Sequence, residues 1–183
     1  MAAAPAASTG SFARRLGFFA VTFVPPAILF NDYVASVATV KGRSMQPTFN
    51  PDSNGVFQDI VLLDRWSITN HRYRRGDVVF FTAPHNPDMI LIKRIIALEG
   101  DTVRPRPKYV SANLPPMPIN PVKIPKGHCW LEGDESFHGI DSNNFGPVPL
   151  GLVTSRVSFV LWPLDRFGLV RSRMPSGRLL EER

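Results

Sequence analysis

The segment from Asp77 to Leu98, DVVFFTAPHNPDMILIKRIIAL, decides the fold class of this chain. Its first part, Asp77–Thr82, is a short run rich in β-branched and aromatic residues, which predicts a strand. Its last part, Met89–Leu98, is a longer apolar run that contains Lys93 and Arg94, and we expect a second strand there. Neither run has the sustained 3.6-residue spacing of apolar positions that predicts an amphipathic helix.

The rest of the chain after Val40 has the same character, with short apolar runs separated by Gly, Pro and Asn. The 183 residues include 18 prolines, and proline disrupts helix interiors and central strands. These features predict a mainly β fold, with an irregular, proline-rich lobe at residues 105–125. Further strands are expected at Asp59–Asp64, His128–Glu132 and Val153–Leu161.

An apolar run of 15 residues, Leu16 to Phe30, precedes this β region. Because a full membrane span needs about 20 residues, three interpretations stay open. The run belongs to a cleaved secretory signal that ends near Ser36-Val37-Ala38, to a targeting segment poor in acidic residues, or to a retained anchor. We favour a transmembrane anchor over residues 16–40, in which Tyr33–Val40 completes the span. Residues 1–15, with their arginine pair, then stay on the side of synthesis.

The charges and the cysteine content limit the remaining possibilities. The net charge of +6 suits an anionic membrane surface or nucleic acid, or is simply that of a basic surface. Positive charges gather in residues 166–183, which we expect to form a basic C-terminal tail.

The single cysteine, Cys129, excludes a disulfide within the chain, and we expect a buried, inert thiol. The histidines show no metal-ligand spacing, so neither a metal nor another cofactor is expected.

Two residues are candidates for catalysis. Ser44 lies shortly after the apolar run, and a serine becomes a nucleophile only when a base activates it. The G-x-S-x-G motif is absent, and no histidine lies in a recognisable triad motif. Lys93 lies within an apolar strand and shares its face with Leu91 and Ile95. It is either an edge-strand lysine that blocks aggregation or a desolvated lysine, whose pKa falls from about 10.4 far enough for it to act as a base.

Four short motifs between Gly42 and Val148 resemble, in order, the sequence boxes of type I signal peptidases. Each motif is weak evidence alone, but together and in this order they are specific. The motifs are Ser44-Met45-Gln46-Pro47-Thr48, Arg75-Gly76-Asp77-Val78-Val79-Phe80, Ile92 to Asp101 (IKRIIALEGD), and Glu132-Gly133-Asp134 followed by Asp141 to Val148 (DSNNFGPV).

The resemblance implies antiparallel sheets with one N-terminal transmembrane helix and a catalytic domain over residues 41–165. It implies a Ser/Lys dyad with Ser44 as the nucleophile and Lys93 as the general base. Arg94 and Asp141 are expected to support the site. Met45 and Pro47, beside the nucleophile, are expected either to contact the substrate or lipid, or only to pack.

Within the family, the chain looks closest to the proteases of the mitochondrial inner membrane. This likeness implies a single-pass protein with its catalytic domain in the intermembrane space, a sister catalytic subunit, contact with the lipid bilayer, and precursor proteins as substrates. No nucleic acid partner is expected. One alternative, a self-cleaving repressor peptidase, needs a DNA-binding region for which the apolar residues before Lys41 are too few. The other alternative is a non-catalytic subunit that stabilises a sister protease subunit.

Three positions depart from the better-known bacterial pattern. Gly42 stands where some members have a serine that helps the oxyanion hole, so a main-chain donor or water must serve. Gly139 stands where members often have a serine that hydrogen-bonds the catalytic lysine. If that hydroxyl matters, Gly139→Ser is expected to raise the rate, provided that the backbone tolerates a side chain. Asn143 replaces an arginine, so Asp141 needs another cation, and Arg94 is the candidate.

Overall fold

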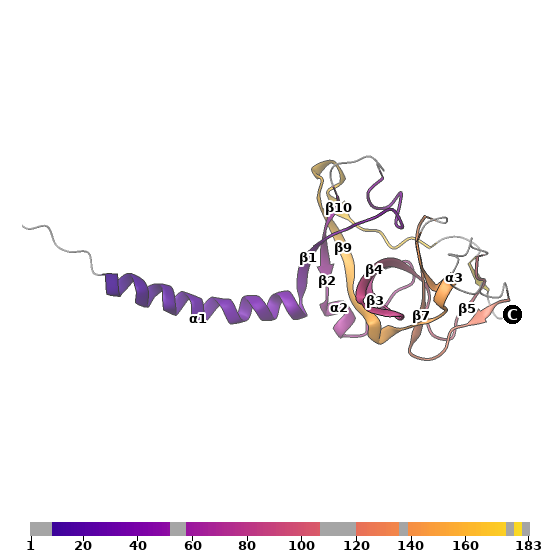
Figure 1. Ribbon diagram of the computed structural model, residues 1–183, viewed down its shortest axis with the longest axis horizontal. Helices are drawn as coiled ribbons and strands as arrows, with labels where there is room; N and C mark the ends of the chain where they lie inside the picture. Colours follow the sequence, from indigo (N-terminus) through magenta and orange to yellow (C-terminus); the bar gives the residue numbers. More distant parts are fainter. Residues whose placement is uncertain (1–8, 52–57, 107–119, 136–138, 175–177, 181–183) are drawn as a thin grey trace, which may run out of the picture.

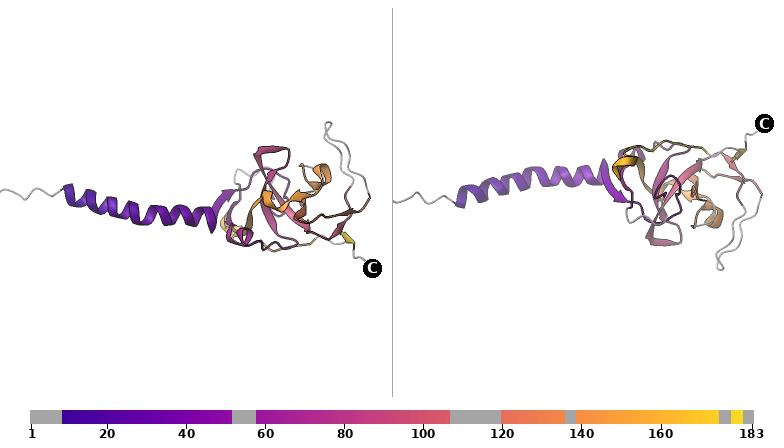
Figure 2. Two further views of the ribbon diagram at one scale, coloured as in Figure 1. Left: turned by 90° about the horizontal axis from the view of Figure 1, so that it is seen from below. Right: turned by 90° about the horizontal axis from the view of Figure 1, so that it is seen from above.

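The computed structural model describes residues 9–51, 58–106, 120–135, 139–174 and 178–180. It consists of a long N-terminal helix, α1 (Thr9–Tyr33), and a β domain from which this helix projects (Figure 1). Strand β5 (Thr102–Val103) lies at the end of the domain far from the helix. The two further views show the same extended arrangement (Figure 2).

Helix α1 has the length and composition of a membrane span. Its segment Phe12–Tyr33 has 22 residues and a mean hydropathy of 1.3, and none of it is buried against the domain. At about 1.5 Å per residue, this segment matches the hydrocarbon core of a bilayer, which is roughly 30 Å thick. Within the described residues, α1 is the one helix that meets these criteria.

The chain after Tyr33 is part of the β domain, so the expectation that Tyr33–Val40 completes the span is wrong. Strand β1 (Ala35–Thr39) pairs antiparallel with β2 (Ile60–Asp64), which satisfies its backbone polar groups outside the membrane. Ser36 is buried and accepts a hydrogen bond from Arg65 Nε at 3.2 Å. The small residues that resemble a cleavage site therefore belong to the sheet.

Antiparallel sheets form the body of the domain, as predicted. The larger sheet has the order β1-β2-β9-β3-β4-β7-β8, with β10 paired to β9, and the smaller has the order β11-β5-β6. The remaining strands are β3 (Val78–Ala83), β4 (Asn86–Ala97), β6 (Val122–Lys123), β7 (His128–Glu132), β8 (Val148–Pro149), β9 (Val153–Trp162), β10 (Gly168–Leu169) and β11 (Leu179–Leu180). Four short helices complete the described elements: α2 (Trp66–Thr69), α3 (Ser142–Phe145), η1 (Leu150–Leu152) and η2 (Leu164–Arg166).

The five predicted strands correspond to β2, β3, β4, β7 and β9, with ends that shift by up to three residues. The largest shift is in β4, which begins at Asn86, opposite Ala83 of β3, after a register shift between Thr82 and Ala83. Most of the predicted irregular lobe, residues 107–119, lies outside the described residues. Its described part contains β6.

Strand β4 is central in the larger sheet, between β3 and β7. Every residue from Ile92 to Ala97 is buried, because apolar clusters cover both faces of this strand. Ile95 packs in the cluster on one face, while Ile92 and Ile96 pack in clusters on the other. Lys93 and Arg94 thus lie inside the domain on opposite faces, each 2% exposed.

The described part of the C-terminal segment, which we expected to form a basic tail, is packed along the domain. Strand β10 pairs with β9. Ser172 Oγ donates a hydrogen bond to Asp77, and the buried Arg178 forms an ion pair with Glu132. Both carboxylates are buried, and buried carboxylates require such partners.

Candidate active site

Ser44 lies in the loop of residues 41–50 between β1 and β2, here called the Ser44 turn. Its backbone is held by hydrogen bonds from Gln46 N to Arg43 O at 3.0 Å and from Phe49 N to Met45 O at 2.9 Å. The side chains of Met45 and Phe49 are each 1% exposed and pack in a core cluster of the domain. They anchor the turn in the core, while Ser44, the residue before Met45, stays half-buried.

The burial of Met45 corrects one expectation. We expected this side chain to contact the substrate or, alternatively, only to pack. A side chain that is 1% exposed inside the core has no free surface for a substrate, so Met45 packs. Pro47 is exposed, and a role in substrate contact stays a prediction for this residue.

Lys93 is a central-strand lysine. It lies in β4 opposite Val79 of β3, and β7 covers the other edge of β4. The alternative of an edge-strand lysine that blocks aggregation is therefore wrong. The burial supports the other interpretation, in which the lysine is withdrawn from water.

Gly139 shows how close Ser44 and Lys93 lie to each other. A Cβ built on Gly139 would lie 2.9 Å from Ser44 Cβ, 3.3 Å from Lys93 Nζ and 3.9 Å from Ser44 Oγ. The nucleophile candidate and the base candidate thus lie against the same small volume. Gly139 has a φ of +110°, which L side chains rarely adopt, so both the backbone and the neighbouring atoms oppose a side chain here.

A second glycine lies against the backbone of Ser44. A Cβ on Gly133 would lie 2.5 Å from Ser44 O, a separation at which the main chain would have to move. Ser44 O also accepts a hydrogen bond from Glu135 N at 3.3 Å. The loop after β7 therefore packs against both the side chain and the carbonyl of Ser44.

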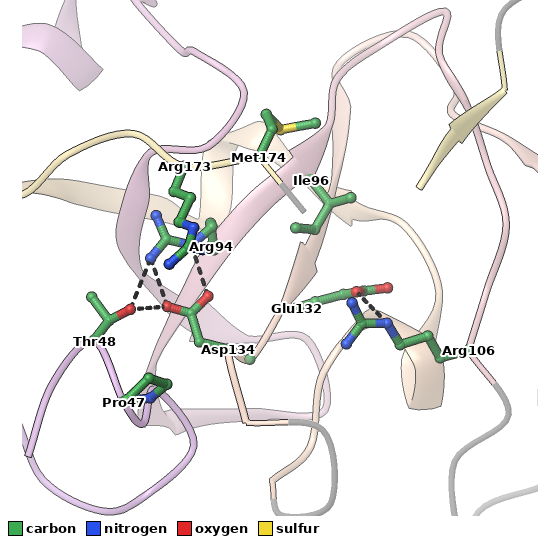
Figure 3. A pocket seen from close by; sticks show the side chains of 10 residues that line it. Pro47, Thr48, Arg94, Ile96, Arg106, Glu132, Asp134, Arg173 and Met174 are labelled. Atoms are coloured by element: carbon green, nitrogen blue, oxygen red, sulfur yellow. Dashed lines mark hydrogen bonds and ion pairs between the residues drawn. The ribbon is translucent and has the colours of Figure 1, made fainter. Parts of the chain in front are cut away.

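Arg94 forms a buried ion pair near the site, and its partner is Asp134 instead of Asp141. Arg94 Nε donates to Asp134 Oδ1 at 2.7 Å, and Nη2 donates to Asp134 Oδ2 at 2.6 Å (Figure 3). Thr48 Oγ1 donates to the same carboxylate at 2.5 Å, and Arg94 Nη1 donates to Gly76 O at 2.7 Å. This network ties the Ser44 turn, through Thr48, to β4 and to the loop after β7.

Asp141 supports the site in a different way. It caps α3, with its side chain accepting a hydrogen bond from Asn143 N at 3.0 Å. Its other oxygen accepts one from Gly133 N at 3.3 Å. Because Gly133 contacts Ser44 O, Asp141 holds the loop that packs on the nucleophile candidate.

A cavity of about 430 Å³ lies on the Arg94 side of β4, here called the Arg94 cavity (Figure 3). Lys93 points to the opposite face of the strand, so the cavity is separate from the Ser44–Lys93 pair. Its lining residues are Pro47, Thr48, Arg94, Ile96, Arg106, Glu132, Gly133, Asp134, Arg173 and Met174.

The described residues contain no group of three or more His, Cys, Asp or Glu side chains arranged to hold a metal ion. Cys129 is fully buried, as predicted, and burial raises the pKa of its thiol to about 12. At neutral pH this group is a thiol, and the thiolate is the nucleophilic form of cysteine.

Sequence reasoning missed Asp134 and Thr48 as parts of the site. Both lie within motifs that resemble the family boxes, and this was the signal available for them. The roles of Asp134 and Thr48 depend on which carboxylate lies near Arg94. The register of β4 against β7 decides this, because it places Arg94 opposite Glu132, two residues before Asp134.

The family described as "Signal peptidase, peptidase S26" matches residues 13–120. The chain belongs to this family. The signal peptidase family comprises serine peptidases, and this membership agrees with the antiparallel fold and the Ser44 site.

Relatives in the family include proteins of the mitochondrial inner membrane. "Mitochondrial inner membrane protease subunit 2" of Mus musculus is 43% identical over 178 residues, covering 94% of this chain and 95% of the mouse protein. The protein of the same name in Schizosaccharomyces pombe is 42% identical over 168 residues, covering 87% of each chain. "Mitochondrial inner membrane protease subunit 1" of Homo sapiens is 36% identical over 149 residues, covering 80% of each. The predicted likeness to the mitochondrial members of the family is confirmed.

Proposed function

We propose that this chain is a membrane-anchored serine endopeptidase that removes sorting peptides from proteins delivered to the mitochondrial intermembrane space. Ser44 is the nucleophile and Lys93 is the general base. The observation that carries this proposal is the pair of contacts at Gly139, where Ser44 and the amine of Lys93 meet the same point. Family membership supports the reaction class, and the names of the relatives support the compartment.

The burial of Lys93 supports its role as base. Removal from water disfavours the charged form of a lysine, and this side chain is 2% exposed. The neutral amine takes the proton from the Ser44 hydroxyl while Oγ attacks the scissile carbonyl carbon. The ammonium that results then donates its proton to the leaving amine when the C–N bond breaks. Lys93 finally activates a water molecule, which hydrolyses the acyl enzyme.

The oxyanion that forms in this reaction needs a hydrogen-bond donor. The Ser44 backbone N–H supplies one, as the family resemblance implies. Gly42 offers no hydroxyl at the position where some bacterial members have a serine. Gly42 has a φ of +86°, and a Cβ there would meet no atom within 4 Å. This open volume beside the nucleophile admits the substrate carbonyl or a water molecule.

The anchor and the partners follow from the helix and from the relatives. Helix α1 holds the chain in the inner membrane, with its Arg14-Arg15 end toward the matrix and the catalytic domain in the intermembrane space. A sister catalytic subunit completes the protease, because the relatives include a subunit 1 and a subunit 2. The alternative, a non-catalytic stabilising subunit, differs in that Ser44 would be dispensable for processing.

The test compares Ser44→Ala with the parent chain in cells that have no other copy. Ser44→Ala should leave expression and membrane attachment intact and abolish processing of the precursors that the parent chain cleaves. Ser158→Ala is the matched control, since Ser158 Oγ donates to Leu62 O at 3.1 Å in the sheet, away from the Ser44 turn. Processing at the parent rate by Ser44→Ala would reject the proposal.

A further inference from the structure

A buried carboxylate outside the dyad holds the far end of the Ser44 turn. Asp59 lies just before β2, and its side chain is 2% exposed. Asn50 N donates to Asp59 Oδ2 at 2.9 Å, and Asp59 N donates to Asn50 Oδ1 at 2.8 Å. Asn50 Nδ2 also donates to Val40 O at 2.8 Å, which brings the two ends of the turn together. Asp59 is thus part of the frame that closes this loop.

The cation that neutralises Asp59 comes from the C-terminal segment. Arg166, at the end of η2, donates from Nη1 to both carboxylate oxygens of Asp59, at 2.8 and 2.6 Å. A guanidinium has a rigid set of donors, so its remaining N–H groups have fixed directions once this pair has formed. Arg166 Nη2 uses one of them to donate to Thr48 O at 2.5 Å.

Arg166 therefore contacts the Ser44 turn directly, through a main-chain carbonyl. Thr48 lies four residues after Ser44, and its side chain is held from the other side by Asp134 and Arg94. The turn is fixed between two arginines, one from β4 and one from the C-terminal segment. A displacement of the Ser44 turn therefore moves Ser44 Oγ relative to Lys93 Nζ.

We propose that Arg166 is a positioning residue for the peptidase reaction, which acts through Asp59 and Thr48 on the turn that carries Ser44. This inference rests on the proposed function, because it takes Ser44 as the nucleophile. The C-terminal segment, which the sequence predicted to be a basic tail, thereby contributes to the rate of the reaction. A misplacement of about 1 Å at a reacting atom can lower a rate on the order of 10²-fold.

A second arginine of the domain provides a matched control. Arg156 of β9 pairs with Asp64 of β2 at 2.5 Å, and its side chain is 23% exposed, as is that of Arg166. Arg156 forms ion pairs with Asp64 and Asp77, and both of these carboxylates lie away from the Ser44 turn. Loss of either pair affects folding, whereas loss of the Arg166 pair also affects the turn.

The experiment compares Arg166→Lys, Arg156→Lys and Ser44→Ala in the full chain, co-expressed with its sister subunit, on a precursor that the parent cleaves. Lysine keeps the positive charge but lacks the fork that reaches both Asp59 and Thr48 O. Arg166→Lys should lower kcat on the order of 10²-fold with KM within about twofold, because it misplaces the nucleophile and leaves substrate binding intact. Arg156→Lys should keep the parent kcat. Rates are measured well below the melting temperatures and normalised to the folded fraction from near-ultraviolet circular dichroism.

The outcomes separate the two proposals. If Ser44→Ala is inactive and Arg166→Lys has the parent kcat, the positioning role is wrong and the proposed function stands. If both arginine variants lose activity only in proportion to their folded fraction, Arg166 is structural and the positioning role is again wrong. If Ser44→Ala keeps its activity, the proposed function fails, and the role of Arg166 fails with it.

Discussion

Gly139 lies so close to Ser44 that a Cβ on the glycine would be 2.9 Å from the Cβ of the serine. From the family resemblance we expected a hydroxyl at the Gly139 position, and we expected Gly139→Ser to raise the rate if the backbone allowed it. The backbone at Gly139 does not allow a side chain, because its φ is +110° and a Cβ would press against Ser44 and Lys93.

Gly139→Ser and Gly139→Ala are therefore expected to lower kcat on the order of 10²-fold or more, because they displace Ser44 from Lys93. Gly151→Ser is the control, since a Cβ there meets no atom within 4 Å. Steady-state kinetics on a cleaved precursor measure the effect. A rate for Gly139→Ser equal to or above that of the parent would contradict the geometry at this site.

The Arg94–Asp134 pair predicts a difference between two arginines with similar hydrogen bonds. Arg94 and Arg75 each bind a carboxylate through Nε and Nη2, but the Arg94 side chain is 3% exposed and that of Arg75 is 47% exposed. Arg94→Gln removes a buried guanidinium that binds both Asp134 and Gly76 O, and this loss should cost about 3–5 kcal/mol. Arg75→Gln removes a surface pair with Asp101 and should cost about 0–1 kcal/mol.

Thermal unfolding of the two variants checks this difference. At about 2–4 °C per kcal/mol for a chain of this size, Arg94→Gln should melt far below Arg75→Gln. Equal melting temperatures would show that the Arg94 network contributes no more than a surface pair. Activity should also fall in Arg94→Gln, because Thr48 of the Ser44 turn shares the Asp134 carboxylate.

The orientation of the chain gives a third prediction. In the proposed topology, α1 crosses the inner membrane with the arginine pair on the matrix side, and the domain from Lys41 onward lies in the intermembrane space. Protease added to mitochondria with ruptured outer membranes should digest the domain, while a matrix marker survives. Protection of the domain until the inner membrane is lysed would reverse the orientation.

Much of the fold followed from local sequence. The strand that carries Lys93 was predicted because its residues are apolar and β-branched, and alternation correctly placed Lys93 and Arg94 on opposite faces. The partner of Arg94 did not follow, because it depends on the register of β4 against β7. The end of the membrane helix was misplaced because Ala35–Thr39 is small and apolar, and this composition fits an anchor as well as a strand.

The C-terminal segment escaped prediction for a related reason. Its arginines look like solvated charges in the sequence, and nothing local identifies Asp59 as the buried partner of Arg166. The same holds for Arg178, which pairs with the buried Glu132 across 46 residues of sequence. Such contacts become visible only when the chain is folded.

In the proposed mechanism neutral Lys93 is the base for Ser44, and Lys93→Arg is the sharpest test of this role. A guanidinium keeps the positive charge but does not lose its proton in a protein. Lys93→Met is the matched control for packing, as it keeps a long side chain and removes the charge. The parent rate should rise with pH as Lys93 deprotonates, since the neutral amine is the active form.

The measurement is kcat/KM for the parent, Lys93→Arg and Lys93→Met on one cleaved precursor, across roughly pH 6 to 10. Both variants should lose at least about 10²–10⁴-fold in kcat/KM at every pH, and the parent alone should show the rise with pH. Lys93→Met should remain folded, as judged by its melting temperature. Substantial activity in Lys93→Arg, with a pH profile like that of the parent, would contradict the assignment of Lys93 as the base.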